Sequence, residues 1–176
     1  LPLYGTMIAH ILRDQTTSLM LAFVVIFFLI AFVLRSGFLS FIAIILNALP
    51  VLTVLGFMGF AGIRLDVATV TIAAALLGIV VDDTVHFLSK YLRARREKGL
   101  NSQDAVRYAF KTVGLALVVT SLVLIGGFFV LTFSAFQLNA NMALMTAVTI
   151  FFAIIADFLL LPPLLMAIDA KEENNA

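Results

Sequence analysis

Residues 78–87 of the chain read GIVVDDTVHF. This stretch lies in an apolar run that begins at Val67 and is long enough to cross a membrane. It places two adjacent carboxylates, Asp82 and Asp83, ahead of a basic segment that begins at Lys90. An ionised Asp at the centre of a membrane helix costs about 2.5–3.5 kcal/mol. We therefore interpret the rest of the chain as a scaffold that holds these two acids inside a bilayer.

The composition predicts an all-α integral membrane protein. Of the 176 residues, 63% are hydrophobic and 12% are charged, and the mean hydropathy is +1.16. Soluble domains are about half apolar and about a quarter charged. The chain has no Cys, and its two histidines, His10 and His86, lie far apart, so we expect no disulfide and no metal site. No nucleophile–base pair is evident, so we do not expect an enzyme.

Five apolar segments are each long enough to cross a hydrocarbon core of about 30 Å as a helix. They do not alternate with a period of two, so they are not barrel strands. The prediction is a polytopic bundle of five transmembrane helices within residues 16–168. The predicted spans are 16–34, 38–61, 67–89, 112–133 and 142–168.

The segments outside the spans carry the polar residues. We expect residues 1–15 to be the end of an extracytoplasmic region or an interfacial helix. Residues 90–111 are predicted to be a cytoplasmic amphipathic segment, and residues 169–176 a short, frayed cytoplasmic tail. Gly99 is a typical helix stop, and Asn101 or Ser102 a typical N-cap for the next helix.

The basic residues predict the orientation of the chain. Seven of the eleven Lys and Arg residues lie in residues 90–111, and basic loops stay in the cytoplasm. The N-terminus is then outside and the C-terminus inside. The chain begins at Leu1 without a signal-peptide pattern, so we expect a fragment of a longer protein. The basic segment could also contact anionic lipid, but we expect no nucleic acid partner.

The acid pair is predicted to carry protons. Two adjacent carboxylates in a medium of low dielectric repel each other, so we expect a coupled pair that holds at least one proton at neutral pH. Gly78, Asp82 and His86 lie on one helical face, which we expect to point into the bundle. Gly78 would let another helix approach, and His86 could pass a proton towards the cytoplasm. This shared face favours Asp82 over Asp83.

Other polar residues in the spans could support the relay. Asp157, in the fifth span, lies at a depth similar to that of Asp82. Thr120 and Ser121, in the middle of the fourth span, could bond to these acids or carry a proton. Gly126 and Gly127 are expected to pack helices closely.

The same residues also have purely structural interpretations. Asp83 could pair with Lys90 or Arg93 at the interface. Asp157 could bind backbone groups that are freed ahead of the following two prolines, and His86 could be a packed or capping residue. The two hydroxyls of the fourth span could bond to their own helix.

Four motifs together resemble a known family. They are LGIVVDDTVHFL at residues 77–88, SQDAV at 102–106, TSL followed by GGF between 120 and 128, and ADFLLLPPLL at 156–165. The first resembles the fourth membrane helix of one half of a resistance-nodulation-division (RND) transporter. The closest resemblance is to the MMPL-type and hopanoid-exporter-like branch, which is related to sterol-sensing-domain proteins. It extends over residues 16–168.

The resemblance implies an architecture and a function. Each half of such a transporter has one span, a large extracytoplasmic domain and then five spans, so this chain would be the C-terminal membrane block. It implies that Asp82 and Asp83 couple proton entry to export of lipids or other hydrophobic molecules across a bacterial or archaeal plasma membrane. The expected partners are membrane lipid, the substrate and the other half of the transporter with its porter domain. No cofactor beyond the proton gradient is expected, and self-association stays open.

Two other classes of protein remain open at this point. One is a lipid-sensing module similar to a sterol-sensing domain. The other is a protein-export accessory of the SecD/SecF type.

Overall fold

The computed structural model describes residues 2–60 and 67–173, and within these ranges it contains helices and no strand. The prediction of an all-α fold is confirmed. The helices are α1 Pro2–Leu34, α2 Gly37–Phe60, α3 Val67–Lys98, α4 Ser102–Ala109, the π-helix η1 Phe110–Gly114, α5 Leu115–Leu131, α6 Gln137–Leu159 and α7 Leu161–Glu173.

Four stretches of the described chain are long and apolar enough to cross a membrane: Thr17–Leu34, Gly37–Phe60, Ser102–Leu131 and Asn139–Asp169. They correspond to the first, second, fourth and fifth predicted spans. The third predicted span lies on α3, which has 32 residues and is about 48 Å long. Large apolar side chains point outward from the bundle, as expected for helices surrounded by lipid.

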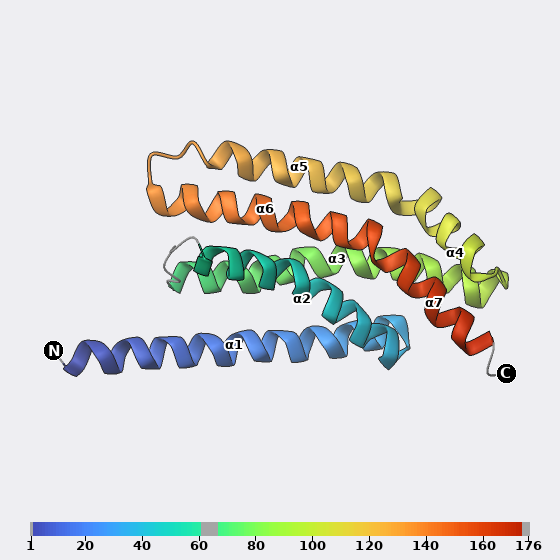
Figure 1. The fold of residues 1–176 in the computed structure, drawn as a ribbon, viewed down its shortest axis with the longest axis horizontal. Helices are drawn as coiled ribbons and strands as arrows, with labels where there is room; N and C mark the ends of the chain where they lie inside the picture. The colour runs from blue at the N-terminus through green and yellow to red at the C-terminus, as the bar shows by residue number, and fades with distance from the viewer. Residues whose placement is uncertain (1, 61–66, 174–176) are drawn as a thin grey trace.

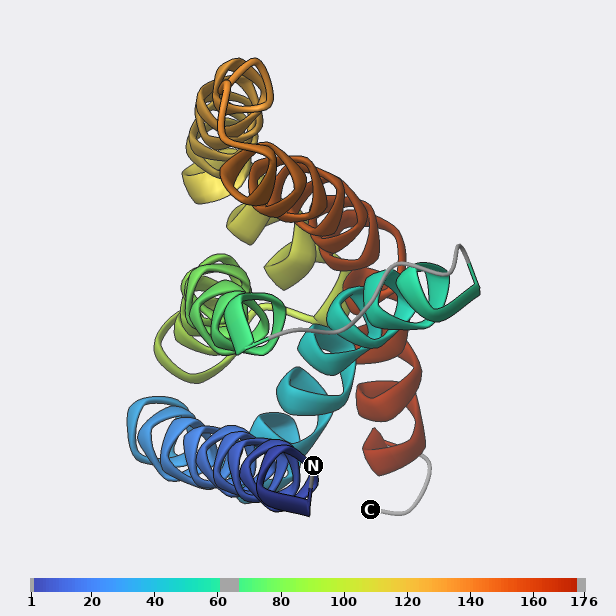
Figure 2. The same cartoon turned by 90° about the vertical axis from the view of Figure 1, so that its left-hand side faces the viewer.

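The α3 helix is central to the bundle. It packs against α1, α2, α4 and α6. In the end-on view it lies between α1 and α5 on one side of the molecule, with α2 and α6 on the other (Figure 2). Its buried side chains follow a helical spacing and include Leu77, Thr84, Leu88 and Tyr91. The face of α3 that these residues do not cover is left open between α1 and α5.

The turn after α3 follows the chemistry predicted from the sequence. The α3 helix ends at Lys98, and Gly99 has a φ of 62°, a left-handed conformation that glycine adopts without strain. The Oδ1 atom of Asn101 then accepts the backbone N–H of Asp104 at 2.8 Å, which caps α4. This confirms the predicted stop and shows that Asn101 is the N-cap.

A cluster of three aromatic rings connects α3, η1 and α6. The ring centroid of Phe110 lies 5.0 Å from that of Phe87 and 5.3 Å from that of Phe158. Phe110 opens the π-helix, whose wider turn overlaps the start of the fourth predicted span. These contacts hold α3 beside α6 about one helical turn after the two acids of α3.

Two helices extend beyond the predicted segments, and one predicted span is divided into two helices (Figure 1). Helix α1 is continuous from Pro2, so residues 2–15 are joined to the first span rather than forming a separate interfacial helix. Helix α3 continues into the basic segment. The fifth span is divided at Leu160 into α6 and α7, because Pro162 and Pro163 lack the backbone N–H that a continuous helix needs.

Candidate functional site

The two adjacent acids point in different directions from α3. Consecutive side chains on a helix are about 100° apart. The side chain of Asp82 is 71% exposed, and its Oδ1 lies 3.5 Å from Nε2 of His86, which is 59% exposed. Asp83 is half-buried, and the hydroxyl of Ser121 on α5 donates to its Oδ2 at 3.0 Å. Our expectation that Asp82 and His86 point into the bundle is therefore wrong for this chain, and Asp83 is the more interior acid.

The structural alternative for Asp83 is not seen in the described residues. Arg93 pairs instead with Glu97 at 2.7 Å, and none of the ion pairs among those residues involves Asp83 or Lys90. The half-buried carboxylate consequently has a hydroxyl partner and no cation.

A second acid, Asp157, is part of a buried network between three helices. Asp157 is 6% exposed, and its Oδ1 lies 2.7 Å from the hydroxyl oxygen of Thr84 on α3. The same hydroxyl oxygen lies 2.9 Å from Oδ1 of Asn47 on α2. The Nδ2 atom of Asn47 donates to the carbonyl of Ala43 at 2.7 Å. We call Asn47, Thr84 and Asp157 the buried network.

Two members of this network, Asn47 and Thr84, were not predicted from the sequence. Asn47 interrupts an otherwise apolar span, and Thr84 follows the acid pair directly, so both carried a weak signal. Asp157 was identified as a candidate, and its carboxylate contacts the Thr84 side chain rather than backbone groups ahead of the prolines. Asp157 is therefore a buried residue that links α6 to α3 inside the bundle.

The two hydroxyls of the fourth span behave differently. Thr120 is exposed and bonds to the carbonyls of Ala116 and Leu117 in its own helix, both at 3.0 Å. This is the structural alternative that the sequence allowed. Ser121 is fully buried and bonds across to Asp83. Of these two hydroxyls, only that of Ser121 contacts an acid of α3.

Two grooves reach the acid pair from the surface of the bundle. The larger, of about 940 Å³, lies between α3 and α5 and is lined by Asp82, Asp83, His86 and Thr120 among apolar side chains. A smaller groove of about 240 Å³, between α1 and α3, also reaches Asp82. Asp82 therefore lies on a ridge between the two grooves, and Asp83 lies at the larger one.

The three glycines predicted to pack helices do not do so within the described chain. A Cβ atom placed at Gly78, Gly126 or Gly127 would have no other atom within 4 Å, apart from its own helix backbone and immediate neighbours. All three are exposed. The prediction of close helix contacts at these positions is corrected accordingly. In α3 the glycine instead leaves the groove beside Asp82 open.

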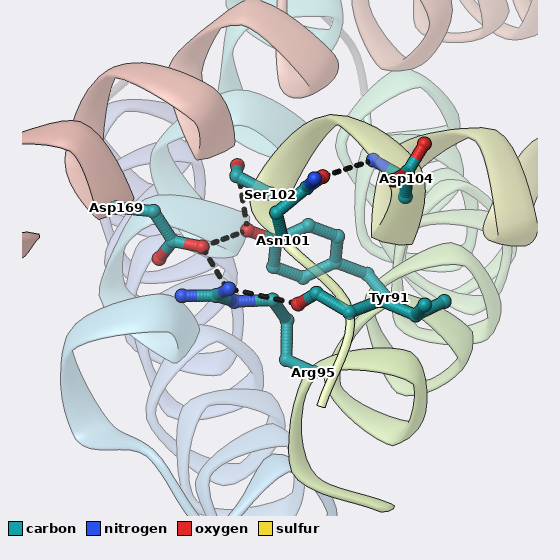
Figure 3. Close-up of polar contacts among 7 residues, drawn as sticks. Tyr91, Arg95, Asn101, Ser102, Asp104 and Asp169 are labelled. Atoms are coloured by element: carbon teal, nitrogen blue, oxygen red, sulfur yellow. Dashed lines mark hydrogen bonds and ion pairs between the residues drawn. The ribbon is translucent and has the colours of Figure 1, made fainter. Parts of the chain in front are cut away.

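Another polar cluster joins α7 to the far end of α3 (Figure 3). Oδ2 of Asp169 lies 2.8 Å from Nε of Arg95, and the hydroxyl of Tyr91 donates to the same carboxylate. Burial of Tyr91, with the adjacent carboxylate, raises its pKa to about 12. We call Tyr91, Arg95 and Asp169 the junction cluster. Because of it, the start of the predicted frayed tail is held against α3.

Metal ligands were not expected, and the described residues contain no group of three or more His, Cys, Asp or Glu side chains that could hold a metal ion.

Comparison with known proteins gives two matches. A sequence model of the MMPL family matches residues 4–173 of the chain. The chain is also similar to the "Putative membrane protein MJ1562" of Methanocaldococcus jannaschii, with 31% identity over 104 residues. This similarity covers 59% of the chain and 26% of the relative, so the aligned region spans about a quarter of the length of that protein.

Proposed function

The chain belongs to the MMPL family, and from this premise we propose that it is the proton-carrying membrane block of a proton-coupled exporter of lipids or other hydrophobic molecules. It is a multi-pass membrane protein, and members of its family are transporters rather than enzymes. The observation that carries the proposal is the half-buried carboxylate of Asp83, which bonds to Ser121 and lies beside Asp82 at an open groove.

Acids without a fixed counter-ion are suited to binding and releasing protons inside a membrane. Asp83 has a hydroxyl partner, and Asp82 has only His86 within ion-pair distance in the described residues. In the proposal, Asp82 and His86 exchange protons with the groove, and Asp83 takes them up with the help of Ser121. Each proton that crosses the full membrane potential yields about 2.3 kcal/mol per 100 mV. In the proposal this energy drives transport, so no cofactor is needed.

The exposed polar face of α3 supports the presence of a protein partner within the membrane. Gly78, Asp82 and His86 are exposed between α1 and α5, in the middle of a helix that the sequence places in the membrane. Exposure of a carboxylate to lipid is costly, so polar faces of this kind lie against protein or water. We propose that the other membrane half of the same transporter covers this face and closes the two grooves.

A hydrophobic substrate is consistent with the apolar surroundings of the bundle. A cavity of about 280 Å³ between α3, α5 and α6 is lined by Leu76, Phe128 and Met142, among other side chains. Its size and lining are suited to a lipid tail. The proposed location is a bacterial or archaeal plasma membrane.

The experiment measures proton flux into phospholipid vesicles that contain the natural protein, using an enclosed pH-sensitive dye. We expect Asp83→Asn and Asp82→Asn to reduce the flux to that of protein-free vesicles, because an amide cannot bind the transported proton. Asp104→Asn is the matched control, since Asp104 lies outside the predicted spans on α4 and pairs with Arg107 at 3.6 Å. Full flux in both α3 variants would show that the proposal is wrong. Lipid binding without proton flux in the unaltered protein would favour a lipid-sensing module instead.

A further inference from the structure

In the buried network, one hydroxyl hydrogen faces two hydrogen-bond acceptors. The Thr84 hydroxyl has one proton but lies 2.7 Å from Oδ1 of Asp157 and 2.9 Å from Oδ1 of Asn47. The amide of Asn47 cannot turn to offer a proton without breaking the bond from its Nδ2 to the Ala43 carbonyl. If Asp157 were ionised, one of the two acceptors that face Thr84 would have no donor.

The surroundings of Asp157 offer no compensating positive charge. Asp157, Thr84 and Asn47 are at most 6% exposed, and none of the ion pairs in the described chain includes Asp157. The charged group that acts on Asp157 from the packed helices is Asp83 on α3, which is an acid itself. Burial of an ionised carboxylate with one hydroxyl donor and no cation is strongly unfavourable.

We propose that Asp157 binds a proton of its own and forms a second proton site, separate from the Asp82–Asp83 pair. In the protonated state, the Asp157 O–H donates to the Thr84 oxygen, and the Thr84 O–H donates to Oδ1 of Asn47. Both acceptors that face Thr84 then take part in a hydrogen bond. As a step in transport this site rests on the proposed function, whereas proton binding by Asp157 does not.

Release of this proton removes the hydrogen bond between α3 and α2. The O–H bond of Asp157 breaks, its electron pair stays on the carboxylate, and the proton passes to water or to an ionised Asp83. The Thr84 hydroxyl then rotates to donate to Asp157, and Oδ1 of Asn47 loses its donor. The α3 helix thereby keeps its hydrogen bond to α6 and loses the one to α2, so α2 is free to shift when the site is empty. Thr84 is a positioning residue in this exchange.

The test is infrared spectroscopy of the natural protein in phospholipid vesicles. A protonated carboxylic acid has a C=O stretching band that an ionised one lacks. We expect such a band at neutral pH that Asp157→Asn abolishes. Thr84→Val should move the band to higher frequency, because a weaker hydrogen bond stiffens the C=O bond, and Thr84→Ser should restore its position.

The control for the loss of a buried hydroxyl is Thr149→Val. Thr149 is buried on α6, and its hydroxyl bonds to the carbonyl of Met145 in its own helix at 2.8 Å. This variant should leave the Asp157 band unchanged. Circular dichroism of each variant checks that the helices are kept. Asp157→Asn and Thr84→Ser change the volume of the site least, so they are the variants expected to disturb the packing least.

Two results would overturn the inference. One is an infrared spectrum in which Asp157→Asn removes no acid band at acidic or neutral pH. The other is an Asp157 band that does not move in Thr84→Val, which would exclude the bond to Thr84. Both readouts are independent of flux. An Asp157 band in a protein whose Asp82 and Asp83 variants keep full flux would refute the proposed function and leave this site standing.

Discussion

The buried network and the junction cluster attach α6 and α7, respectively, to α3, yet they contain different chemistry. In the junction cluster, the guanidinium of Arg95 and the hydroxyl of Tyr91 bind the carboxylate of Asp169. In the buried network, Asp157 bonds to one hydroxyl, and it forms no ion pair among the residues that the structure describes. The carboxylate of Asp169 thus has a fixed cation as its partner, whereas Asp157, in our proposal, holds a proton instead. The α3 helix is consequently fastened to α7 by an ion pair, and in our proposal its bond to α2 depends on the proton of Asp157.

The largest effect on stability is expected where one side chain serves two buried acceptors. Thr84→Val removes the only hydroxyl between Asp157 and Asn47. We expect the free energy of unfolding in mixed micelles to fall by about 2–4 kcal/mol, since each buried group without a partner costs about 1–3 kcal/mol. Thr149→Val, which affects a bond within one helix, should cost roughly 1 kcal/mol. Equal losses in the two variants would contradict the bridging role of Thr84.

Removal of the cation from the junction cluster should have a smaller effect, because the cluster is partly open to solvent. The side chains of Arg95 and Asp169 are 32% and 16% exposed. We expect Arg95→Met to lower the free energy of unfolding by about 1–2 kcal/mol, as the carboxylate keeps Tyr91 as a partner.

The matched control for this change is Arg93→Met, two residues earlier on the same helix. Arg93 and Glu97 form an exposed pair with side chains 56% and 61% exposed. The loss of this pair should have a smaller effect than the loss of the Arg95 pair, because solvent screens exposed ion pairs. An effect of Arg95→Met no greater than that of Arg93→Met would show that the junction cluster does not fasten α7.

The smallest effect is a dependence of stability on alkaline pH. The pKa of Tyr91 is raised from 10.0 to about 12 in the folded protein. The folded state therefore holds the phenol proton more tightly than the unfolded state. This contribution is complete below pH 10.0 and is lost as the pH rises through about 12.

We expect this loss to be roughly 1 kcal/mol after allowance for screening by solvent. It is measured as the change in unfolding free energy between neutral and strongly alkaline pH. Tyr91→Phe should remove that part of the dependence, because phenylalanine does not titrate. An identical alkaline slope in the variant would assign the dependence to other groups.

The sequence alone determined the elements of the fold and the family. The apolar segments predicted the membrane helices, and Gly99 and Asn101 predicted the stop and the cap. These features depend on residues that are near each other in the chain, so local patterns are sufficient. The motifs around Asp82 and Asp157 were also sufficient to indicate the MMPL family, which the comparison confirms.

Only the tertiary structure decided which acids are buried and what they contact. A stripe such as Gly78, Asp82 and His86 marks one face of a helix, but in lipid the opposite face is apolar as well, so the pattern does not show which face is inside. The partners of Thr84 lie 37 and 73 residues away in the sequence. Their meeting depends on how α2, α3 and α6 pack together, and helix packing is set by contacts between distant segments that no local pattern encodes.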